Sequence, residues 1–282
     1  MQNVLIAGCG YVGISLAYRL MRDGYRVFGL RRHTDFLPPE VHAIKANLRD
    51  LESLRPMPEY FDFVFYTASA DHYDEVSYQR AYVDGLWNLL EALQNEGERP
   101  KRIIYTSSTG VSGQQDGELV DEDSPTDPTS PTGRCLIEGE TLLHDSMFES
   151  VVVRLAGIYG PGRTRVIDRV RDGDAQCVKD RTTMLNHIHR DDCAGVLQHV
   201  MTLEKPAKLY LAVDNEPADL CEAQRWIAKE LGVPEPPVVP ADQAPARVRG
   251  GNRRYSNRRL LESGYEFQYP TYREGYASLL HH

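Results

Sequence analysis

Short apolar runs rich in Val, Ile, Leu and Phe recur along the chain, separated by longer segments with apolar residues at helical spacing. The runs predict buried β-strands at residues 4–7, 26–30, 61–66, 102–106, 151–155 and 209–213. The longer segments predict amphipathic helices at residues 12–22, 78–94, 133–144 and 192–203. Because strands and helices alternate, we expect right-handed crossovers and a parallel sheet with helices on both faces.

This pattern weakens after residue 159. Residues 160–188 are rich in Arg, Asp and Gly, and the prolines of residues 233–250 predict an irregular connector. We therefore expect a first domain at residues 1–159, to which residues 189–213 return, and a smaller C-terminal lobe of residues 160–188 and 214–280. The predicted fold class is α/β, with a doubly wound parallel sheet of about seven strands and a smaller substrate-type lobe.

A glycine-rich turn joins the first strand to the first helix. Gly8, Gly10 and Gly13 have the GxGxxG spacing of a Rossmann dinucleotide-binding domain. Gly8 permits the tight turn, Gly10 lets the backbone approach a pyrophosphate, and Gly13 allows close packing of helix and strand. The helix N-terminus adds N–H groups and a positive dipole end. We expect the diphosphate of a dinucleotide to be held by Gly8, Gly10, Tyr11, Val12 and Gly13.

The end of the second strand bears on the choice of cofactor. NAD sites usually place an acid there to hold the ribose 2′-hydroxyl, whereas this chain has Arg31 and Arg32. Guanidinium groups suit bidentate contacts with the 2′-phosphate of NADP. Asp35 is the only acid nearby and is expected beyond the strand, in the loop. We predict NADP as the preferred cofactor, with NAD as the alternative.

The charge balance excludes some partners. The 282 residues carry a formal net charge of −9, and no basic face is obvious, so nucleic acid is not an expected partner. The acidic run at residues 117–127 is typical of a solvated loop. No apolar stretch reaches the roughly 18 residues that cross a membrane, so no membrane association is expected.

The cysteines give a prediction about the compartment. They are odd in number and lack a CxxC pair: Cys9, Cys135, Cys177, Cys193 and Cys221. We expect neither a disulfide framework nor a zinc or other metal site. This usage predicts a reducing compartment and a cytoplasmic protein.

Together these motifs resemble the short-chain dehydrogenase/reductase superfamily, in its extended epimerase/dehydratase-like branch and, within that branch, the bacterial YeeZ-like proteins. Residues 61–68 and 105–111 look like the fourth and fifth strands of that family, and residues 154–163 like the loop that lies against nicotinamide. Residues 186–192 resemble the segment before a late helix. The resemblance implies further cofactor contacts at Asn47, Leu48, Thr67, Ala68, Ser69, Ser107 and Tyr159.

The catalytic Tyr-x-x-x-Lys pair of that family is missing. Its spacing puts both side chains on one helix face, where the ammonium lowers the pKa of the phenol. By the resemblance, Thr132 takes the Tyr position and Leu136 the Lys position, and none of the 16 tyrosines has a Lys four residues later. Ser108 remains as the candidate catalytic residue, while Tyr82 stands where many members carry Asn. We do not expect the standard mechanism.

Two functions stay open. One is an oxidoreductase or sugar-nucleotide-modifying enzyme with relocated catalytic groups, acting on a nucleotide sugar or a small carbonyl compound. The other is an NADP-binding sensor or scaffold without turnover. The candidate substrate-binding residues are Arg163, Asn186 and His187. The candidate proton donors are Tyr66, Tyr82 and Tyr159. The resemblance also implies a homodimer formed through the helices near residues 78–94 and 133–144.

Overall fold

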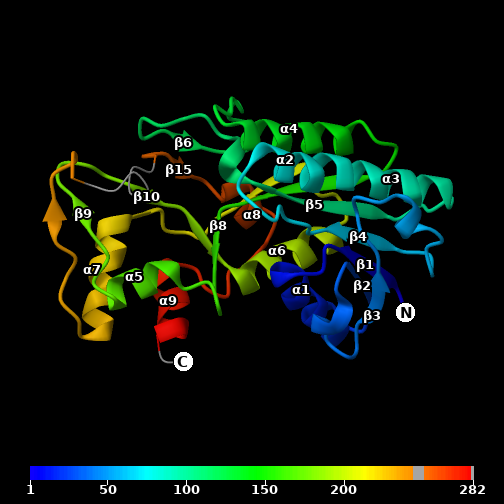
Figure 1. Cartoon of the computed structure of the whole chain (residues 1–282), viewed down its shortest axis with the longest axis horizontal. Coiled ribbons are helices and arrows are strands. Elements are labelled where there is room, and N and C mark those ends of the chain that lie inside the picture. The colour runs from blue at the N-terminus through cyan, green and yellow to red at the C-terminus, as the bar shows by residue number, and fades with distance from the viewer. Residues whose placement is uncertain (244–250, 281–282) are drawn as a thin grey trace. The chain divides into compact units, whose positions relative to one another are not determined.

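The computed structural model describes residues 1–243 and 251–280 (Figure 1). It divides into two compact units. Unit 1 comprises Met1–Gly113, Pro125–Leu155 and Cys193–Tyr210, and unit 2 comprises Gln114–Ser124, Ala156–Asp192 and the residues from Leu211 onward. This division differs from the predicted one at Gln114–Ser124, because β6 (Leu119–Val120) pairs with β15 (Arg254–Tyr255) within unit 2. It also assigns to unit 2 residues 156–159, 189–192 and 211–213, which were predicted to belong to the first domain. Residues 244–250 of the predicted connector lie outside the described residues.

Unit 1 is built on a seven-stranded sheet in the order β12-β7-β5-β4-β1-β2-β3. The strands are β1 (Asn3–Ala7), β2 (Arg26–Arg31), β3 (His42–Lys45), β4 (Phe63–Tyr66), β5 (Arg102–Ser108), β7 (Ser150–Leu155) and β12 (Leu209–Ala212). Every pair from β3 to β7 is parallel, which confirms the predicted Rossmann architecture. The prediction missed β3, because this edge strand is mostly exposed and has no apolar run.

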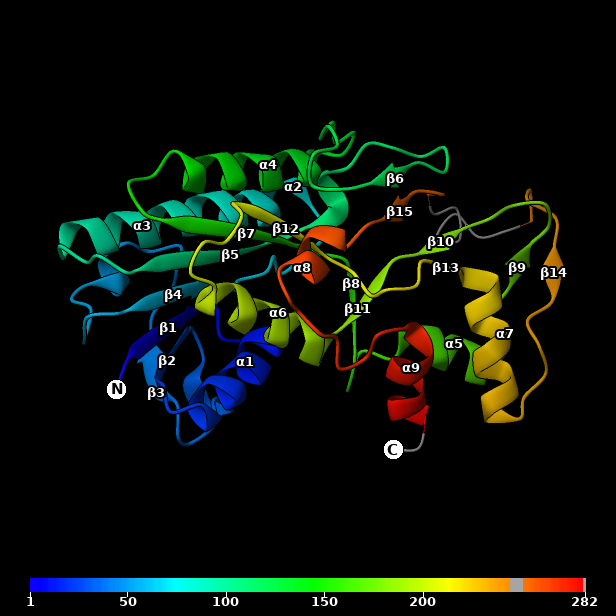
Figure 2. The same cartoon turned by 180° about the vertical axis from the view of Figure 1, so that it is seen from behind.

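Helices cover both faces of this sheet. In both views α1 (Tyr11–Arg22) and α6 (Arg190–Thr202) lie on one face (Figure 1), and α2 (Glu75–Tyr78), α3 (Gly85–Asn95) and α4 (Pro131–His144) on the other (Figure 2). Short 3₁₀ turns join these elements: η1 (Thr34–Phe36), η2 (Glu52–Leu54) and η4 (Thr109–Val111). The core on the α3 face includes Leu5, Val64 and Ile103 from the strands and Leu89 and Leu93 from the helix.

The single helix predicted at residues 78–94 is interrupted. A π-helical segment, η3 (Gln79–Asp84), lies between α2 and α3. Within η3 the carbonyl of Ala81 accepts a hydrogen bond from the buried Tyr66 hydroxyl, and the Tyr82 carbonyl accepts one from the Tyr105 hydroxyl. The spacing of apolar residues cannot reveal a short π-helical segment, because the buried residues lie on the same side of the helix before and after it.

The described residues of unit 2 form short strand pairs and four helices. Its strands are β8 (Gly157–Tyr159), β9 (Cys177–Val178), β10 (Met184–Leu185), β11 (His187–His189), β13 (Ala218–Asp219) and β14 (Val238–Val239), besides β6 and β15. β8 pairs with β11 and β9 with β14, both parallel, while β10 and β13 are antiparallel. The helices are α5 (Arg165–Arg171), α7 (Leu220–Leu231), α8 (Arg258–Glu262) and α9 (Tyr272–Leu280). Their core includes Ile167, Val170, Ile227, Tyr272 and Tyr276.

One cysteine prediction is wrong. Cys177 in β9 and Cys221 in the first turn of α7 form a disulfide, across a sequence separation of 44 residues. Sequence spacing cannot reveal this pair, since packing of α7 against β9 brings the two cysteines together. Cys9, Cys135 and Cys193 are buried and take part in no disulfide. The disulfide removes the cysteine-based reason for expecting a reducing compartment.

Within the described residues, no helix is long and apolar enough to span a membrane. The same residues contain no group of three or more His, Cys, Asp or Glu side chains arranged to hold a metal ion.

Candidate functional site

The glycine-rich turn after β1 has the geometry that a phosphate-binding loop needs. Gly8 has φ +81°, and a Cβ there would overlap the backbone of Ala68. The N–H groups of Gly8 and Cys9 both donate to the carbonyl of Leu30, at 2.9 and 3.2 Å, so the turn is fixed against the end of β2. Gly8 is therefore required by the fold itself.

Gly10 differs from Gly8. A Cβ at Gly10 would meet only the Gly8 carbonyl, at 3.7 Å, so the protein leaves open space beside this residue. Gly10 is also the N-cap of α1, whose first turn holds Tyr11, Val12 and Gly13 and carries no acidic residue. The positive end of the helix dipole thus faces a space in which an anion can approach the backbone.

A cavity of about 210 Å³ lies beside this turn, entirely within unit 1. Thr67 supports its wall, because its hydroxyl donates to the Gly8 carbonyl at 3.0 Å. The predicted cofactor-binding residues that line the cavity are Gly8, Gly10, Arg31, Arg32, Asn47, Leu48, Ala68 and Ser69. Those that do not are Tyr11, Val12, Gly13, Thr67, Ser107 and Tyr159.

Asn47 and Leu48 lie in the loop after β3. The Asn47 side chain accepts a hydrogen bond from the Arg49 backbone N–H at 3.2 Å, which fixes this turn. The Leu48 carbonyl accepts a hydrogen bond from the Asn88 side chain at 2.8 Å, which ties the loop to α3. This wall of the cavity is thus built from fixed backbone.

Four arginines line the cavity beside the glycine-rich turn: Arg31, Arg32, Arg49 and Arg80. Arg31 Nη1 donates to the Cys9 carbonyl at 3.1 Å and so also holds the glycine-rich turn. Arg32 Nη2 and Arg49 Nη2 each lie 2.8 Å from an oxygen of Asp71. The sequence had not singled out Arg49 or Asp71, because the pairing depends on loops that follow different strands.

The prediction that Asp35 is the only nearby acid is therefore wrong. Asp35 lies in η1 and does not line the cavity, whereas Asp71, 39 residues after Arg32, does. Since the carboxyl ends of parallel strands share one sheet edge, the loop after β4 brings its acid to the end of β2.

The candidate catalytic residues lie around the ends of β5 and α4. Ser108 is half-buried, and its Oγ accepts a hydrogen bond from the Gly110 N–H at 3.1 Å. Thr132 is 6% exposed, and its hydroxyl lies 3.1 Å from the Ser130 hydroxyl. Leu136 is 2% exposed. Neither Thr132 nor Leu136 offers a titratable group here.

Ser107 has a different role from the predicted one. It is 5% exposed, and its hydroxyl donates to Glu140 Oε1 at 2.6 Å, inside the core of unit 1. Its side chain is therefore committed to the protein interior and does not face the cavity. The resemblance could not show this, because Glu140 and Arg154 form the interaction from other elements.

The buried tyrosines of unit 1 are poor proton donors. Burial raises the pKa of the Tyr66 phenol well above its usual range, and its hydroxyl already donates to the Ala81 carbonyl. Tyr105 is buried in the same way. The hypothesis that Tyr66 supplies protons is therefore not supported by its placement.

The remaining site predictions fall in unit 2. Tyr159 is 4% exposed, and its ring packs against His187, His189 and Tyr276, so its side chain belongs to the core of that unit. Burial raises the pKa of its phenol. This placement contradicts the predicted roles of the Tyr159 side chain in cofactor contact and proton donation.

His187 and Asn186 are also held within unit 2. His187 Nδ1 lies 2.7 Å from the Tyr276 hydroxyl, and burial lowers the pKa of the imidazole to about 4. The Asn186 side chain donates to the Arg253 carbonyl and accepts from the Tyr255 N–H, both at 3.1 Å. The Asn186 amide therefore joins β15 to the start of β11, which accounts for it without a substrate. Arg163 is exposed.

Comparisons with known proteins agree with this architecture. The NAD dependent epimerase/dehydratase family matches residues 4–210. Protein YeeZ of Escherichia coli K12 is 30% identical over 282 residues, covering 96% of this chain and 97% of YeeZ. The 3-diazoavenalumate denitrifying reductase of a Streptomyces species is 27% identical, with 86% of each chain covered.

Solved structures show the same fold. A protein of Methylobacillus flagellatus described as an NAD-dependent epimerase/dehydratase has a TM-score of 0.82 and 34% identity, covering 99% of this chain and 97% of its own. The human epimerase family protein SDR39U1, solved with NADPH, has a TM-score of 0.81 at 19% identity and covers 99% of both chains, which shows the fold alone. The chain belongs to the NAD-dependent epimerase/dehydratase family, within the short-chain dehydrogenase/reductase superfamily.

Proposed function

We propose that this protein binds NADP(H) in the cavity of unit 1 and uses it as an oxidoreductase that lacks the Tyr-x-x-x-Lys pair. The observation that carries the proposal is the cluster of arginines beside the glycine-rich turn. The space at Gly10 and the N-terminus of α1 suit the pyrophosphate. Arg31 and Arg32 at the end of β2 suit the 2′-phosphate.

Calorimetric titration with NADP⁺, NADPH, NAD⁺ and NADH tests cofactor choice. We expect NADP(H) to bind about tenfold or more tightly than NAD(H), since each charge-assisted hydrogen bond contributes about 1.5–3 kcal/mol. Arg32→Ala is the sharper variant, because Arg31 also holds the Cys9 carbonyl. Arg22→Ala removes the same charge from a side chain that is 72% exposed, at the end of α1, and is the matched control. Equal affinity of the wild type for both cofactors would contradict the proposal.

The chemistry we propose is reduction of a small carbonyl compound or a nucleotide sugar. When bound, NADPH would supply the hydride, and water would supply the proton that completes the new hydroxyl group. Ser108, at the carboxyl end of β5, is the residue whose hydroxyl can donate a hydrogen bond to a substrate oxygen. We propose that Thr132 and Leu136 occupy the Tyr and Lys positions, so that no activated phenol takes part. The similarity to a protein named as a reductase supports this direction of reaction.

A screen of NADPH oxidation across nucleotide sugars and small aldehydes and ketones tests this part. We expect turnover that falls by about 10²-fold in Ser108→Ala and is unchanged in Thr132→Ala. Variants of Tyr66 and Tyr105 are not needed, since their buried hydroxyls are already engaged. Turnover insensitive to Ser108→Ala would mean that another group donates the hydrogen bond to the substrate oxygen.

A second candidate function is an NADP-binding sensor or scaffold without turnover. The burial of Thr132 and Leu136 favours it, because both positions serve packing in this chain. The two functions differ in one result: a sensor binds NADP(H) with the expected preference, yet oxidises no NADPH with any substrate in the screen.

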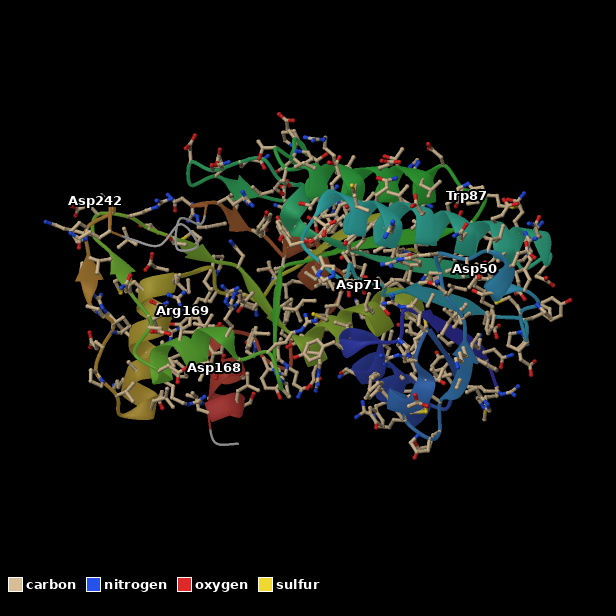
Figure 3. All side chains as sticks on the ribbon, viewed as in Figure 1. Asp50, Asp71, Trp87, Asp168, Arg169 and Asp242 are labelled. Atoms are coloured by element: carbon tan, nitrogen blue, oxygen red, sulfur yellow. A yellow bond between two sulfur atoms is a disulfide. The ribbon has the colours of Figure 1, made fainter. Side chains whose placement is uncertain are left out.

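We also propose a homodimer formed through η3, α3 and α4. A groove of about 800 Å³ lies on this face, lined by Val83, Trp87 and Leu142 among others. Trp87, labelled in Figure 3, is 48% exposed in the single chain. Trp87→Glu should convert a dimer into a monomer in light scattering, whereas Met147→Glu, at another exposed apolar residue, should not.

The proposed location is the cytoplasm. The disulfide between Cys177 and Cys221 does not support this location by itself. Fractionation of the producing cells, with the thiol state of Cys177 and Cys221 trapped by alkylation, tests both points at once.

A further inference from the structure

Three loops of unit 1 bring opposite charges to one point of the cavity. Arg32 follows β2, Arg49 follows β3, and Asp71 lies in the loop between β4 and α2. Asp71 Oδ1 lies 2.8 Å from Arg32 Nη2, and Asp71 Oδ2 lies 2.8 Å from Arg49 Nη2. A second contact joins Arg32 Nη1 to Asp71 Oδ2 at 3.4 Å. One carboxylate therefore accepts hydrogen bonds from two guanidinium groups.

The Asp71 carboxylate is ionised, and positive side chains outnumber it in the cavity. Hydrogen bonds from Arg32, and then from Arg49, hold the pKa of Asp71 below its usual range. Among the residues that line the cavity, Asp71 is the only acid, whereas Arg31, Arg32, Arg49 and Arg80 are cations. A cavity with this balance attracts a further anion.

The position of Asp71 allows its carboxylate to be replaced. The residues between the end of β4 and the start of α2 form neither helix nor strand, and the Asp71 side chain is 37% exposed. Arg32 directly follows β2, and Arg49 lies in the loop after β3, which is fixed by the Asn47 side chain and by the hydrogen bond from Asn88 to the Leu48 carbonyl. A phosphate dianion accepts guanidinium hydrogen bonds in the same manner as a carboxylate and carries more charge.

We propose that Asp71 is an internal stand-in for the 2′-phosphate of the cofactor, and that Arg32 and Arg49 together form the fork that binds this phosphate once it displaces the carboxylate. The inference rests on the proposed NADP(H) function and deepens it, because it adds Arg49 as a specificity-determining residue and gives Asp71 a role in setting the affinity. In the absence of cofactor the carboxylate keeps the two guanidinium groups together. The incoming phosphate takes the same hydrogen-bond donors.

Nucleotide fragments test this without the nicotinamide half. The probes are 2′,5′-ADP, which carries the 2′-phosphate, and ADP, which lacks it, each titrated by calorimetry into the full chain. Arg49→Met should weaken 2′,5′-ADP binding about tenfold or more and leave ADP binding unchanged. Asp71→Asn should strengthen 2′,5′-ADP binding about threefold or more, because the competing charge is removed while the size of the side chain is kept.

The control for charge alone is Asp50→Asn. Asp50 directly follows Arg49 in sequence and is exposed, and its carboxylate accepts a hydrogen bond from the Glu52 N–H. Figure 3 labels both Asp50 and Asp71. Asp50→Asn should change 2′,5′-ADP binding less than Asp71→Asn does. In Arg49→Met, adding Asp71→Asn should give a smaller gain than in the wild type, since one of the two released donors is gone.

Each other outcome overturns a distinct statement. Weaker 2′,5′-ADP binding in Asp71→Asn would show that Asp71 positions the arginines for the phosphate and does not compete with it. Weaker ADP binding in Asp71→Asn would make the carboxylate an acceptor for the ribose hydroxyl. If the wild type binds NADP⁺ and NAD⁺ equally, the NADP(H) proposal itself fails. If the wild type prefers NADP⁺ but neither variant changes 2′,5′-ADP binding, only the inference on Arg49 and Asp71 fails.

Discussion

Arg154 on β7 and Glu140 on α4 form an ion pair that is almost entirely buried, with side chains 8% and 11% exposed. Arg154 Nη2 lies 2.6 Å from Glu140 Oε2, and Arg154 Nε lies 2.9 Å from Glu140 Oε1. The Ser107 hydroxyl completes the network by donating to the same carboxylate. Arg154 is thus a structural ion-pair partner within unit 1.

Breaking this pair should be costly. Glu140→Gln or Arg154→Met leaves one buried charge without its partner, so each should lower the free energy of unfolding by about 3–5 kcal/mol. Urea unfolding followed by circular dichroism measures the change. The exposed pair of Arg258 and Glu262 is the control, and Glu262→Gln should cost less than about 1 kcal/mol. A small effect of Glu140→Gln would mean that water reaches the pair.

Two glycines of the same loop should separate stability from binding. Gly8→Ala should destabilise the fold, because φ is +81° and a Cβ would overlap Ala68. Gly10→Ala should leave the midpoint of thermal unfolding nearly unchanged, since the space beside it is open, but should weaken dinucleotide binding about tenfold or more. Calorimetric binding and thermal unfolding of both variants check this. Unchanged binding in a folded Gly10→Ala variant would place the cofactor elsewhere.

Restoring the missing lysine should fail. Leu136 is 2% exposed in α4, so Leu136→Lys buries an ammonium and should cost about 3 kcal/mol or more. Leu136→Met conserves volume and should cost less than about 1.5 kcal/mol. Denaturant unfolding compares the two. A stable Leu136→Lys variant that gains NADPH-dependent turnover together with Thr132→Tyr would show that α4 can still hold a Tyr-x-x-x-Lys pair in a working geometry.

Asp214 should make the stability of the protein depend on pH. Burial raises the pKa of its carboxyl from 3.8 to about 8, and Glu216, Asp192 and Glu274 add to this, while the Glu216 N–H opposes it. The folded state therefore binds more protons than the unfolded chain between these two values, and stability falls as pH rises from about 4 to about 8. Asp214→Asn should flatten this fall and stabilise the protein at pH 8.

The measurement is thermal unfolding at half-unit steps of pH. Asp242→Asn, at an exposed acid labelled in Figure 3, is the control and should leave the profile unchanged. A profile that stays steep in Asp214→Asn would assign the fall to another buried acid, of which Glu122, with its pKa raised by burial, is the next to test.

The disulfide should contribute to stability. It closes a loop of 44 residues between β9 and α7, and the chain-entropy estimate for such a loop is about 4 kcal/mol. Cys177→Ser with Cys221→Ser should therefore lower the midpoint of denaturation, and dithiothreitol should do the same to the wild type only. Alkylation under non-reducing conditions that labels both cysteines would show that the bond is absent.

The strands of the sheet could be predicted well because most of them are short apolar runs, which are typical of buried strands. The fully buried β4 and β7 are examples, and only β3, a polar edge strand, escaped notice. The glycine-rich turn could also be recognised, because three glycines at this fixed spacing indicate a turn whose backbone conformation and close contacts only glycine allows. These features are local, and a single sequence contains them.

What could not be predicted depends on side chains from distant segments. Asp71 meets Arg32 across 39 residues, and Glu140 meets Ser107 across 33. Tyr159 resembled a cofactor contact because of its motif, but the packing around it in unit 2 decides its orientation. Residue spacing along the chain does not show which distant side chains come into contact. The disulfide was missed for the same reason.

The strand order has a consequence for synthesis on the ribosome. β12 is the strand next to β7 at the edge of the sheet, and the Val152 N–H of β7 donates to the Lys208 carbonyl just before β12. Arg102 Nη1 donates to the carbonyls of Val200, Met201 and Leu203, which also come late in the chain. While residues 156–207 are translated, which takes on the order of several seconds, the apolar edge of β7 has no partner. During that interval the unpaired edge of β7 is exposed and prone to aggregation. A chain truncated before β12 should therefore be found bound to chaperones or aggregated, and not as a free N-terminal domain.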